Sequence, residues 1–273
     1  MNDYSLVFTC SDLLIQKNIR NKKIILVQEG MTDPEKLGFY LVKYFNFPRW
    51  MASTSVTGLS NYYDKFCVAS EGYRKLFIQK GVDPGKIEIT GIPNFDDCEK
   101  FLDNDFPHHG FVLVATSDMR ETYKYENRKK FIEEAYSIAQ GKQLIFKLHP
   151  NENYDRAFAE IKKYAPGSLV FHHEQIEPMI ANCDTLITRF SSVAYIGLIL
   201  GKIVYSEFDV EKLKHLVPIQ NGGTSAFHIA QIGRRLLAEN ECFSIFAIRK
   251  NPVKQIPLKE KFKFRRKLAK VKH

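Results

Sequence analysis

Polar side chains follow two apolar runs in the sequence, at positions where they could act together on a ligand. One run ends in Lys147 and His149, and a later run ends in Ser191 and Ser192. Short runs rich in Ile, Leu and Phe, bounded by polar or turn residues, are typical of buried parallel strands. Ligands bind beyond the carboxyl ends of such strands in open α/β sheets. We therefore expect these four side chains to lie on one rim of a sheet.

The two serines precede a helical pattern over residues 193–200. A helix N-terminus with unpaired N–H groups and nearby hydroxyls favours an anion. Lys147, His149, Ser191 and Ser192 are therefore predicted to recognise a phosphate or diphosphate. The alternative is structural, because serines often cap helices and a His-Pro pair can simply end a strand.

Apolar runs and helical patterns alternate along the chain, which predicts parallel α/β sheets. A turn-rich stretch at residues 103–109 is the best candidate for a domain boundary. We expect one domain at residues 1–105, a second at 106–248 and a basic tail at 249–273. Strands are predicted at residues 5–9, 23–28, 65–69, 86–90, 110–116, 143–148, 168–171, 184–188 and 202–206, and the last helix at 224–239.

The net charge of +9 is concentrated at the end of the chain. Residues 249–273 hold eleven Lys and Arg against one Glu, which leaves 29 basic and 30 acidic residues before them. Cations mixed with Phe262, Phe264 and Leu268 suit a segment that lies on an anionic membrane surface. The alternative is a solvated tail. Without a basic face before the tail, no nucleic-acid partner is expected.

The five cysteines lack a CxxC pair, and four of them lie in or beside apolar runs. Reduced core cysteines in a cytoplasmic protein explain this pattern better than disulfides or metal ligands. The first residues lack the features of a signal peptide, and no run approaches the ~20 apolar residues of a membrane span. We expect a cytoplasmic protein, with the tail able to bring it to the inner membrane face. HxxxH and HExxH patterns are absent, so neither a metal nor a cofactor is predicted.

The segment of residues 63–96 resembles the interdomain region of GT-B enzymes, where UDP-N-acetylglucosamine 2-epimerases and many glycosyltransferases carry a similar sequence. Residues 147–150 and 188–202 are similar to the HP and SS motifs of two groups, the CDP-glycerol glycerophosphotransferases and the bacterial sialyl- and capsule-polysaccharide transferases. The resemblance covers roughly residues 60–210. It implies an α/β, GT-B-like fold with two Rossmann-like, doubly wound parallel-sheet domains. The N-terminal domain is expected to be abridged, because only about 105 residues precede the boundary.

In those families the HP histidine and the paired serines contact the phosphates of the donor nucleotide. The resemblance therefore implies donor-phosphate roles for His149, Ser191 and Ser192, with Lys147 as an additional contact and His149 also catalytic. The charge of the departing nucleotide grows in the transition state, where preorganised donors stabilise it selectively. The donor substrate would be a nucleotide-activated sugar.

Gln28, Glu29 and Gly30 form a second constellation after the apolar run at residues 23–27. Bacterial sialyltransferases have a similar acidic-acidic-glycine motif, whose carboxylate acts as the general base on the acceptor hydroxyl. The resemblance implies this catalytic role for Glu29, although Gln28 replaces the first acid. An ordinary surface glutamate is the alternative.

Further donor-binding candidates follow other strands. Thr116 and Ser117 come after the strand predicted at residues 110–116, Arg120 lies close by, and Glu177 begins a helix. In GT-B proteins, the loop that corresponds to the one after residues 110–116 faces the donor. A helix cap and a solvated arginine are the alternatives.

Three functions remain open on the sequence. The first is a glycosyltransferase, or a glycerophosphotransferase-like enzyme, that modifies a cell-surface polysaccharide or lipid-linked acceptor. The second is an enzyme like the UDP-N-acetylglucosamine 2-epimerases, which share the segment at residues 63–96. The third is a non-catalytic GT-B relic that binds a nucleotide or a partner enzyme.

Overall fold

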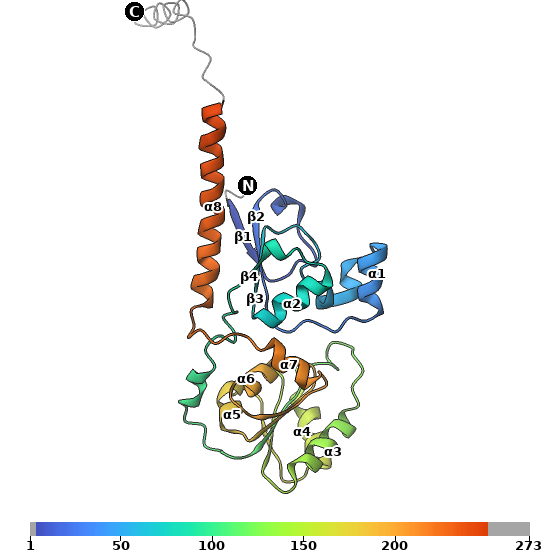
Figure 1. The fold of residues 1–273 in the computed structure, drawn as a ribbon. Coiled ribbons are helices and arrows are strands. Elements are labelled where there is room, and N and C mark those ends of the chain that lie inside the picture. Colours follow the sequence, from blue (N-terminus) through green and yellow to red (C-terminus); the bar gives the residue numbers. More distant parts are fainter. Residues whose placement is uncertain (1–3, 251–273) are drawn as a thin grey trace, which may run out of the picture. The chain divides into compact units, whose positions relative to one another are not determined.

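The structure is a computed structural model that describes residues 4–250, with side chains through Ala238. Its first four strands form one parallel sheet in chain order, β1-β2-β3-β4. Apolar residues fill the central strands, so that Ile24, Leu26 and Phe66 are fully buried. The elements of this part (Figure 1) are β1 (Leu6–Thr9), η1 (Lys17–Ile19), β2 (Lys23–Val27), α1 (Leu37–Phe45), η2 (Arg49–Val56), β3 (Lys65–Val68), α2 (Glu71–Lys80), η3 (Pro84–Lys86) and β4 (Ile87–Ile89).

A second parallel sheet has five strands in the order β7-β6-β5-β8-β9. The order reverses direction at β5, as in a doubly wound sheet. Its elements, after η4 (Glu99–Leu102), are β5 (Val112–Ala115), α3 (Arg128–Ala139), β6 (Leu144–Lys147), α4 (Tyr154–Tyr164), β7 (Leu169–Phe171), α5 (Ile176–Asn182), β8 (Thr185–Thr188), α6 (Val193–Ile199), β9 (Ile203–Tyr205) and α7 (Val210–Leu216). The predicted α/β class is confirmed, and each predicted strand forms within two residues of its expected ends.

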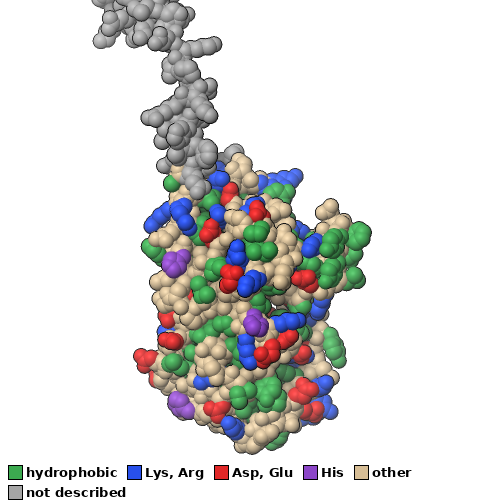
Figure 2. All heavy atoms as spheres, viewed as in Figure 1, with side chains coloured by type: hydrophobic (Ala, Val, Ile, Leu, Met, Phe, Trp, Pro, Cys, Tyr) green, Lys and Arg blue, Asp and Glu red, His purple; other side chains and the backbone are tan. Residues whose placement is uncertain are grey.

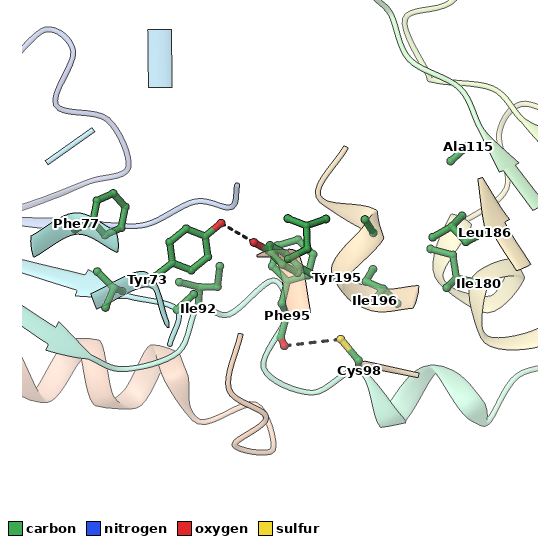
Figure 3. Close-up of a cluster of buried hydrophobic side chains, with 14 of the residues drawn as sticks. Tyr73, Phe77, Ile92, Phe95, Cys98, Ala115, Ile180, Leu186, Tyr195 and Ile196 are labelled. Carbon is green, nitrogen blue, oxygen red and sulfur yellow. Dashed lines mark hydrogen bonds between the residues drawn. The ribbon is translucent and has the colours of Figure 1, made fainter. Parts of the chain in front are cut away.

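Strands and helices of both sheets contribute side chains to one buried hydrophobic cluster. Tyr73 from α2 and Tyr195 from α6 point toward one another in this cluster (Figure 3), with their hydroxyl oxygens 2.6 Å apart. Ile92, Phe95 and Cys98 of the connecting segment also belong to it. The residues after β4 are therefore packed into the core rather than extended as a free linker.

The last helix, α8 (Ser225–Lys250), is longer than predicted. Its expected end at Glu239 was wrong, because neither glycine nor proline occurs between Gly233 and Pro252 to stop the helix. One compact unit extends to Gln231, and the described part of a second unit is the rest of α8. The expected membrane segment around Phe262 lies outside the described residues, and the domain boundaries at residues 105 and 248 stay predictions.

Among the described helices, none is both long and apolar enough to cross a bilayer. Cys67, Cys98 and Cys183 are buried free thiols, whereas Cys10 is an exposed one. Burial raises the pKa of the Cys67 thiol to about 12, so this side chain stays protonated at neutral pH.

Candidate functional site

The carboxyl ends of strands from both sheets surround one cavity of about 340 Å³. Cys10 follows β1, residues 28–33 follow β2, and Phe190 and Ser192 follow β8. The other lining residues are Thr54, Thr57, Asn94 and Phe208. Because open α/β sheets bind ligands beyond the carboxyl ends of their strands, this cavity is the candidate site.

Gly30 and Ser192 bring the two predicted motifs together. A Cβ atom built on Gly30 would lie 3.5 Å from Ser192 Cβ and 3.7 Å from Ser192 Oγ. Any side chain larger than a methyl group at position 30 would therefore enter the space beside Ser192. Glu29 and Ser192, predicted from separate motifs, line the same cavity.

Gln28 fixes the loop that carries Glu29. Its Nε2 donates a hydrogen bond to the Gly30 carbonyl at 2.8 Å, and its Oε1 accepts one from the Ala69 N–H at 2.9 Å. The side chain is buried, whereas Glu29 is exposed. A carboxylate cannot donate to the Gly30 carbonyl, so an amide fits this position better than the acid found in the sialyltransferase motif.

His149 lies at the carboxyl end of β6, two residues beyond the strand. Its backbone N–H donates to Thr116 Oγ1 at 3.1 Å, and its Nδ1 accepts from the Asn151 N–H at 3.2 Å. Asp118 Oδ2 lies 4.0 Å from Nδ1. His149 is not among the residues that line the 340 Å³ cavity. It shares the sheet edge with Ser191, since β6 and β8 both pair with β5.

The predicted helix after the serines is confirmed as α6, which begins at Val193. Ser192 precedes it with helical backbone angles and makes no side-chain capping bond. Ser191 Oγ accepts only a long hydrogen bond, 3.4 Å, from the Val193 N–H. Capping therefore accounts for little of this pair of hydroxyls.

Lys147 is engaged by the protein rather than directed to the cavity. Its Nζ donates to the Leu148 carbonyl at 2.8 Å and to the His172 carbonyl at 2.9 Å. Burial lowers the pKa of this ammonium group, and Glu174 and Glu177 oppose the shift. Glu177, in the first turn of α5, thus favours the protonated form of Lys147 by raising its pKa.

Arg120 is also engaged by protein partners. Its two terminal nitrogens bind both oxygens of Glu160, at 2.8 and 2.9 Å. This bidentate pair is the strongest arrangement that an arginine makes with a carboxylate. The guanidinium group of Arg120 is therefore bound to Glu160 of α4 and is not free to contact a phosphate.

Arginine and glutamate side chains from the loop of residues 116–127 and from segments near it form a largely buried cluster, of which sequence reasoning singled out only Arg120. Glu126, which is fully buried, lies 3.6 Å from each of Arg120, Arg128 and Arg189. Glu152 contacts Arg128 and Arg120. We call these five residues the buried charge cluster. They are scattered over some seventy positions, from 120 to 189, so no local motif announces them.

Two buried hydroxyls at the same sheet edge lack partners among the described residues. They are Ser117 Oγ, after β5, and Thr188 Oγ1, at the end of β8. Buried polar atoms in native proteins are nearly always hydrogen-bonded, so each unpaired one calls for an explanation. Thr116, by contrast, is paired with Glu152.

Comparison with known proteins identifies the fold. No family model matches the chain, and no curated protein sequence matches it. Among solved structures, MnaA from S. aureus with UDP matches 85% of this chain and 74% of its own, with a TM-score of 0.58 and 11% identity. The Methanocaldococcus jannaschii UDP-GlcNAc 2-epimerase with UDP-GlcNAc and UDP matches 84% and 76%, with a TM-score of 0.55 and 14% identity.

The wall teichoic acid polymerase TagF, in a variant soaked with CDPG, matches 87% of this chain and 73% of its own, with a TM-score of 0.50 and 16% identity. The chain has a GT-B-like fold. The resemblance drawn from residues 63–96 and from the HP and SS segments is thereby confirmed at the level of fold. At these identities the likeness says nothing of individual residues.

A second cavity of about 430 Å³ adjoins the first in this GT-B-like chain. The two cavities share Met31, Thr32, Asp33 and Phe208. The remaining lining residues of the second cavity are mainly apolar or charged: Pro34, Glu35, Tyr73, Leu76, Lys80, Glu207, Asp209, Lys212, Leu213 and Leu216. Among the described side chains, no group of three or more His, Cys, Asp or Glu is placed to hold a metal ion.

Proposed function

We propose that this chain is a transferase, acting as a glycosyltransferase or in the manner of a glycerophosphotransferase, that uses a nucleotide-activated donor. The observation that carries the proposal is the meeting of Glu29 and Ser192 on one cavity. They come from separate sheets and from the two motifs that the sequence singled out. Two such motifs have no structural need to share a cavity.

The lining of the 340 Å³ cavity suits hydroxyl groups better than phosphates. It contains the carboxylates of Glu29 and Asp33, several hydroxyls and the amides of Gln28 and Asn94. No Lys or Arg belongs to the lining among the described residues. Carboxylates and amides bind the hydroxyls of a sugar or an acceptor well, whereas two negative charges oppose a phosphate.

The phosphates of the donor are assigned to the adjoining sheet edge. His149 and Ser191 follow the ends of β6 and β8, which both pair with β5. Ser192 stands between this edge and the cavity. Lys147 and Arg120 take no direct part in this proposal, because carbonyl and carboxylate partners already engage them.

In the proposed reaction the acceptor hydroxyl lies in the cavity and gives its proton to the Glu29 carboxylate. The hydroxyl oxygen bonds to the reacting atom of the donor as the bond to the nucleotide phosphate breaks. The electron pair leaves with the nucleotide, and His149 with the Ser191 and Ser192 hydroxyls stabilises the charge that develops there. The acceptor is a polysaccharide or a lipid-linked molecule, and it extends into the second cavity.

An activity like that of the UDP-N-acetylglucosamine 2-epimerases is the second candidate. Two of the solved structures with the higher TM-scores, 0.58 and 0.55, contain UDP, and one of them is a UDP-GlcNAc 2-epimerase. This likeness reports the fold. The Ser191-Ser192 pair and the placement of Glu29 favour the transferase instead.

Product analysis tests the proposal. The purified chain is incubated with UDP-, CDP-, CMP- and GDP-activated donors, with and without polysaccharide or lipid-linked acceptors. A transferase releases free nucleotide in proportion to acceptor, and Glu29→Gln slows that release. Conversion of UDP-N-acetylglucosamine without acceptor would indicate the epimerase, and nucleotide binding without turnover would leave a binding protein.

A further inference from the structure

An unusually apolar surface covers α1 and the start of η2. Trp50 is 75% exposed, and Phe45 and Tyr44 are 69% and 65% exposed. Figure 2 shows hydrophobic side chains gathered over α1. We call this the aromatic surface, which consists of Leu37, Tyr40, Tyr44, Phe45, Phe47, Trp50 and Met51. Contiguous apolar surface of this kind marks an interaction site in soluble proteins.

The core does not require these side chains. α1 turns Phe39 and Val42 inward, where they pack with Ala52 and Val56 of η2. Gly38 allows the two elements to approach closely, since a Cβ there would lie 2.7 Å from the Met51 carbonyl oxygen. The inner face of α1 is therefore satisfied, and the aromatic surface is left for another purpose.

Within residues 36–63, the segment that carries the aromatic surface, the charged side chains have one sign. Residues 36–63 contain Lys36, Lys43 and Arg49 but no acidic residue. Arg49 pairs with the buried Asp12 at 3.0 Å, whereas Lys36 is exposed and Lys43 is half-buried. Lys43 Nζ lies 5.4 Å from the centre of the Tyr44 ring. Two exposed acidic residues, Asp33 and Glu35, precede this segment; both line the second cavity, and Asp33 accepts a hydrogen bond from Thr54 Oγ1 at 2.7 Å.

This combination matches the interface of an anionic bilayer. Trp and Tyr rings partition to the level of the lipid headgroups, and Lys residues beside them attract anionic lipids. A second copy of the chain fits less well, because a symmetric contact would bring Lys36 and Lys43 of both copies together. We propose that the aromatic surface docks this protein on an anionic membrane.

Trp50 is the only tryptophan in the chain, so its fluorescence reports on this surface alone. Vesicles of phosphatidylglycerol and phosphatidylcholine are titrated into the full-length protein. We expect a blue shift of the emission and quenching by lipids that carry a spin label on the acyl chain. Pure phosphatidylcholine vesicles should give a weaker effect, because they lack the anionic headgroups.

A double variant, Tyr44→Ser with Phe45→Ser, should reduce vesicle binding severalfold while leaving the circular dichroism spectrum unchanged. The matched control is Tyr123→Ser with Tyr125→Ser, which removes two exposed aromatic rings from another part of the chain. This control should bind vesicles as the parent does.

Three results would overturn the proposal. An unshifted Trp50 in protein that nonetheless sediments with vesicles would place the lipid contact elsewhere, such as in the basic tail. A blue shift that grows with protein concentration in the absence of lipid would show that a second copy covers the surface. Equal vesicle binding by the Tyr44→Ser, Phe45→Ser variant would show that the aromatic surface is not needed.

Discussion

The hydroxyl oxygens of Tyr73 and Tyr195 lie 2.6 Å apart in a fully buried position. Tyr73 belongs to α2, which packs on the first sheet, and Tyr195 belongs to α6, beside the serines of the second sheet. Burial raises the pKa of Tyr73 to about 12 and that of Tyr195 still further, so both remain protonated. The pair therefore joins a helix that follows a strand of the first sheet to one that follows a strand of the second, and Tyr73 also lines the second cavity.

Removing one hydroxyl of this pair should lower the free energy of unfolding, because the other hydroxyl stays buried without its partner. Tyr195→Phe leaves the Tyr73 hydroxyl without this partner, at a cost of about 1–3 kcal/mol in the free energy of unfolding. Tyr73→Phe with Tyr195→Phe should cost less than the sum of the single changes. Urea unfolding of all four proteins measures the coupling energy. Strict additivity would mean that the two hydroxyls do not interact.

The reactivity of the Cys10 thiol should depend on the charge of Glu29. Burial raises the pKa of the Cys10 thiol, and the nearby Glu29 carboxylate raises it further. Glu29→Gln removes the negative charge, so more thiolate forms at neutral pH and alkylation by iodoacetamide should accelerate. Peptide mass spectrometry follows Cys10 separately from the other thiols. Glu88→Gln, which changes a carboxylate on β4, is the control, and an unchanged Cys10 rate in Glu29→Gln would contradict the shared cavity.

Lys80 should make the free energy of unfolding vary with pH in the alkaline range. Burial lowers the pKa of this ammonium group, while Glu35 and Asp33 oppose the shift. The unfolded chain, with a pKa of about 10.4, then binds more protons than the folded one between the two pKa values. The free energy of unfolding should rise with pH across that window.

Lys80→Met should lack this rise. Urea unfolding midpoints of both proteins, measured from neutral pH to about pH 10, test the difference. Parallel curves would show that Lys80 has an ordinary pKa in the folded state. A constant offset between them is expected, because Lys80 Nζ also donates to the Ser55 carbonyl at 3.1 Å.

The buried charge cluster should be sensitive to the loss of one carboxylate. Glu126→Gln removes one of the two buried carboxylates of the cluster and leaves Glu152 as the other. Removing one member of a buried ion pair typically costs about 3–5 kcal/mol. Lys129→Gln breaks the exposed Lys129–Glu133 pair, 3.8 Å apart, and should cost less than about 1 kcal/mol. Thermal unfolding of the two variants compares them. Similar losses would show that the cluster is solvated.

Much of the fold could be predicted from the sequence, because buried parallel strands leave unmistakable apolar runs. Each of the runs at residues 143–148 and 184–188 became a strand of one sheet. The end of α8 was missed because only a helix-stopping residue marks where a helix ends in a sequence. After Gly233, no glycine or proline occurs before Pro252.

The site was less predictable, because a motif gives the position of a residue and not its partners. Glu29 and Ser192 do line one cavity, but Arg120 and Lys147 turned out to be held by Glu160 and by backbone carbonyls. Asn94 was not singled out as a site residue. Such contacts join residues far apart in sequence, which a local pattern cannot reveal.

Nucleotide binding tests the central claim most directly. UDP, CDP, CMP and GDP are titrated into the parent chain, into His149→Ala with Ser191→Ala and Ser192→Ala, and into the control His228→Ala, which alters an exposed position on α8. A ligand at 100 times its Kd raises the free energy of unfolding by about 2.7 kcal/mol, which thermal unfolding detects readily.

We predict that at least one nucleotide raises the Tm of the parent and of the control, and that the triple variant binds it at least tenfold more weakly. Each lost hydrogen bond to a charged phosphate is worth about 1.5–3 kcal/mol, so the loss should be plain. Equal binding by the triple variant, or no binding of any nucleotide by the parent, would contradict the assignment of a donor site to this sheet edge.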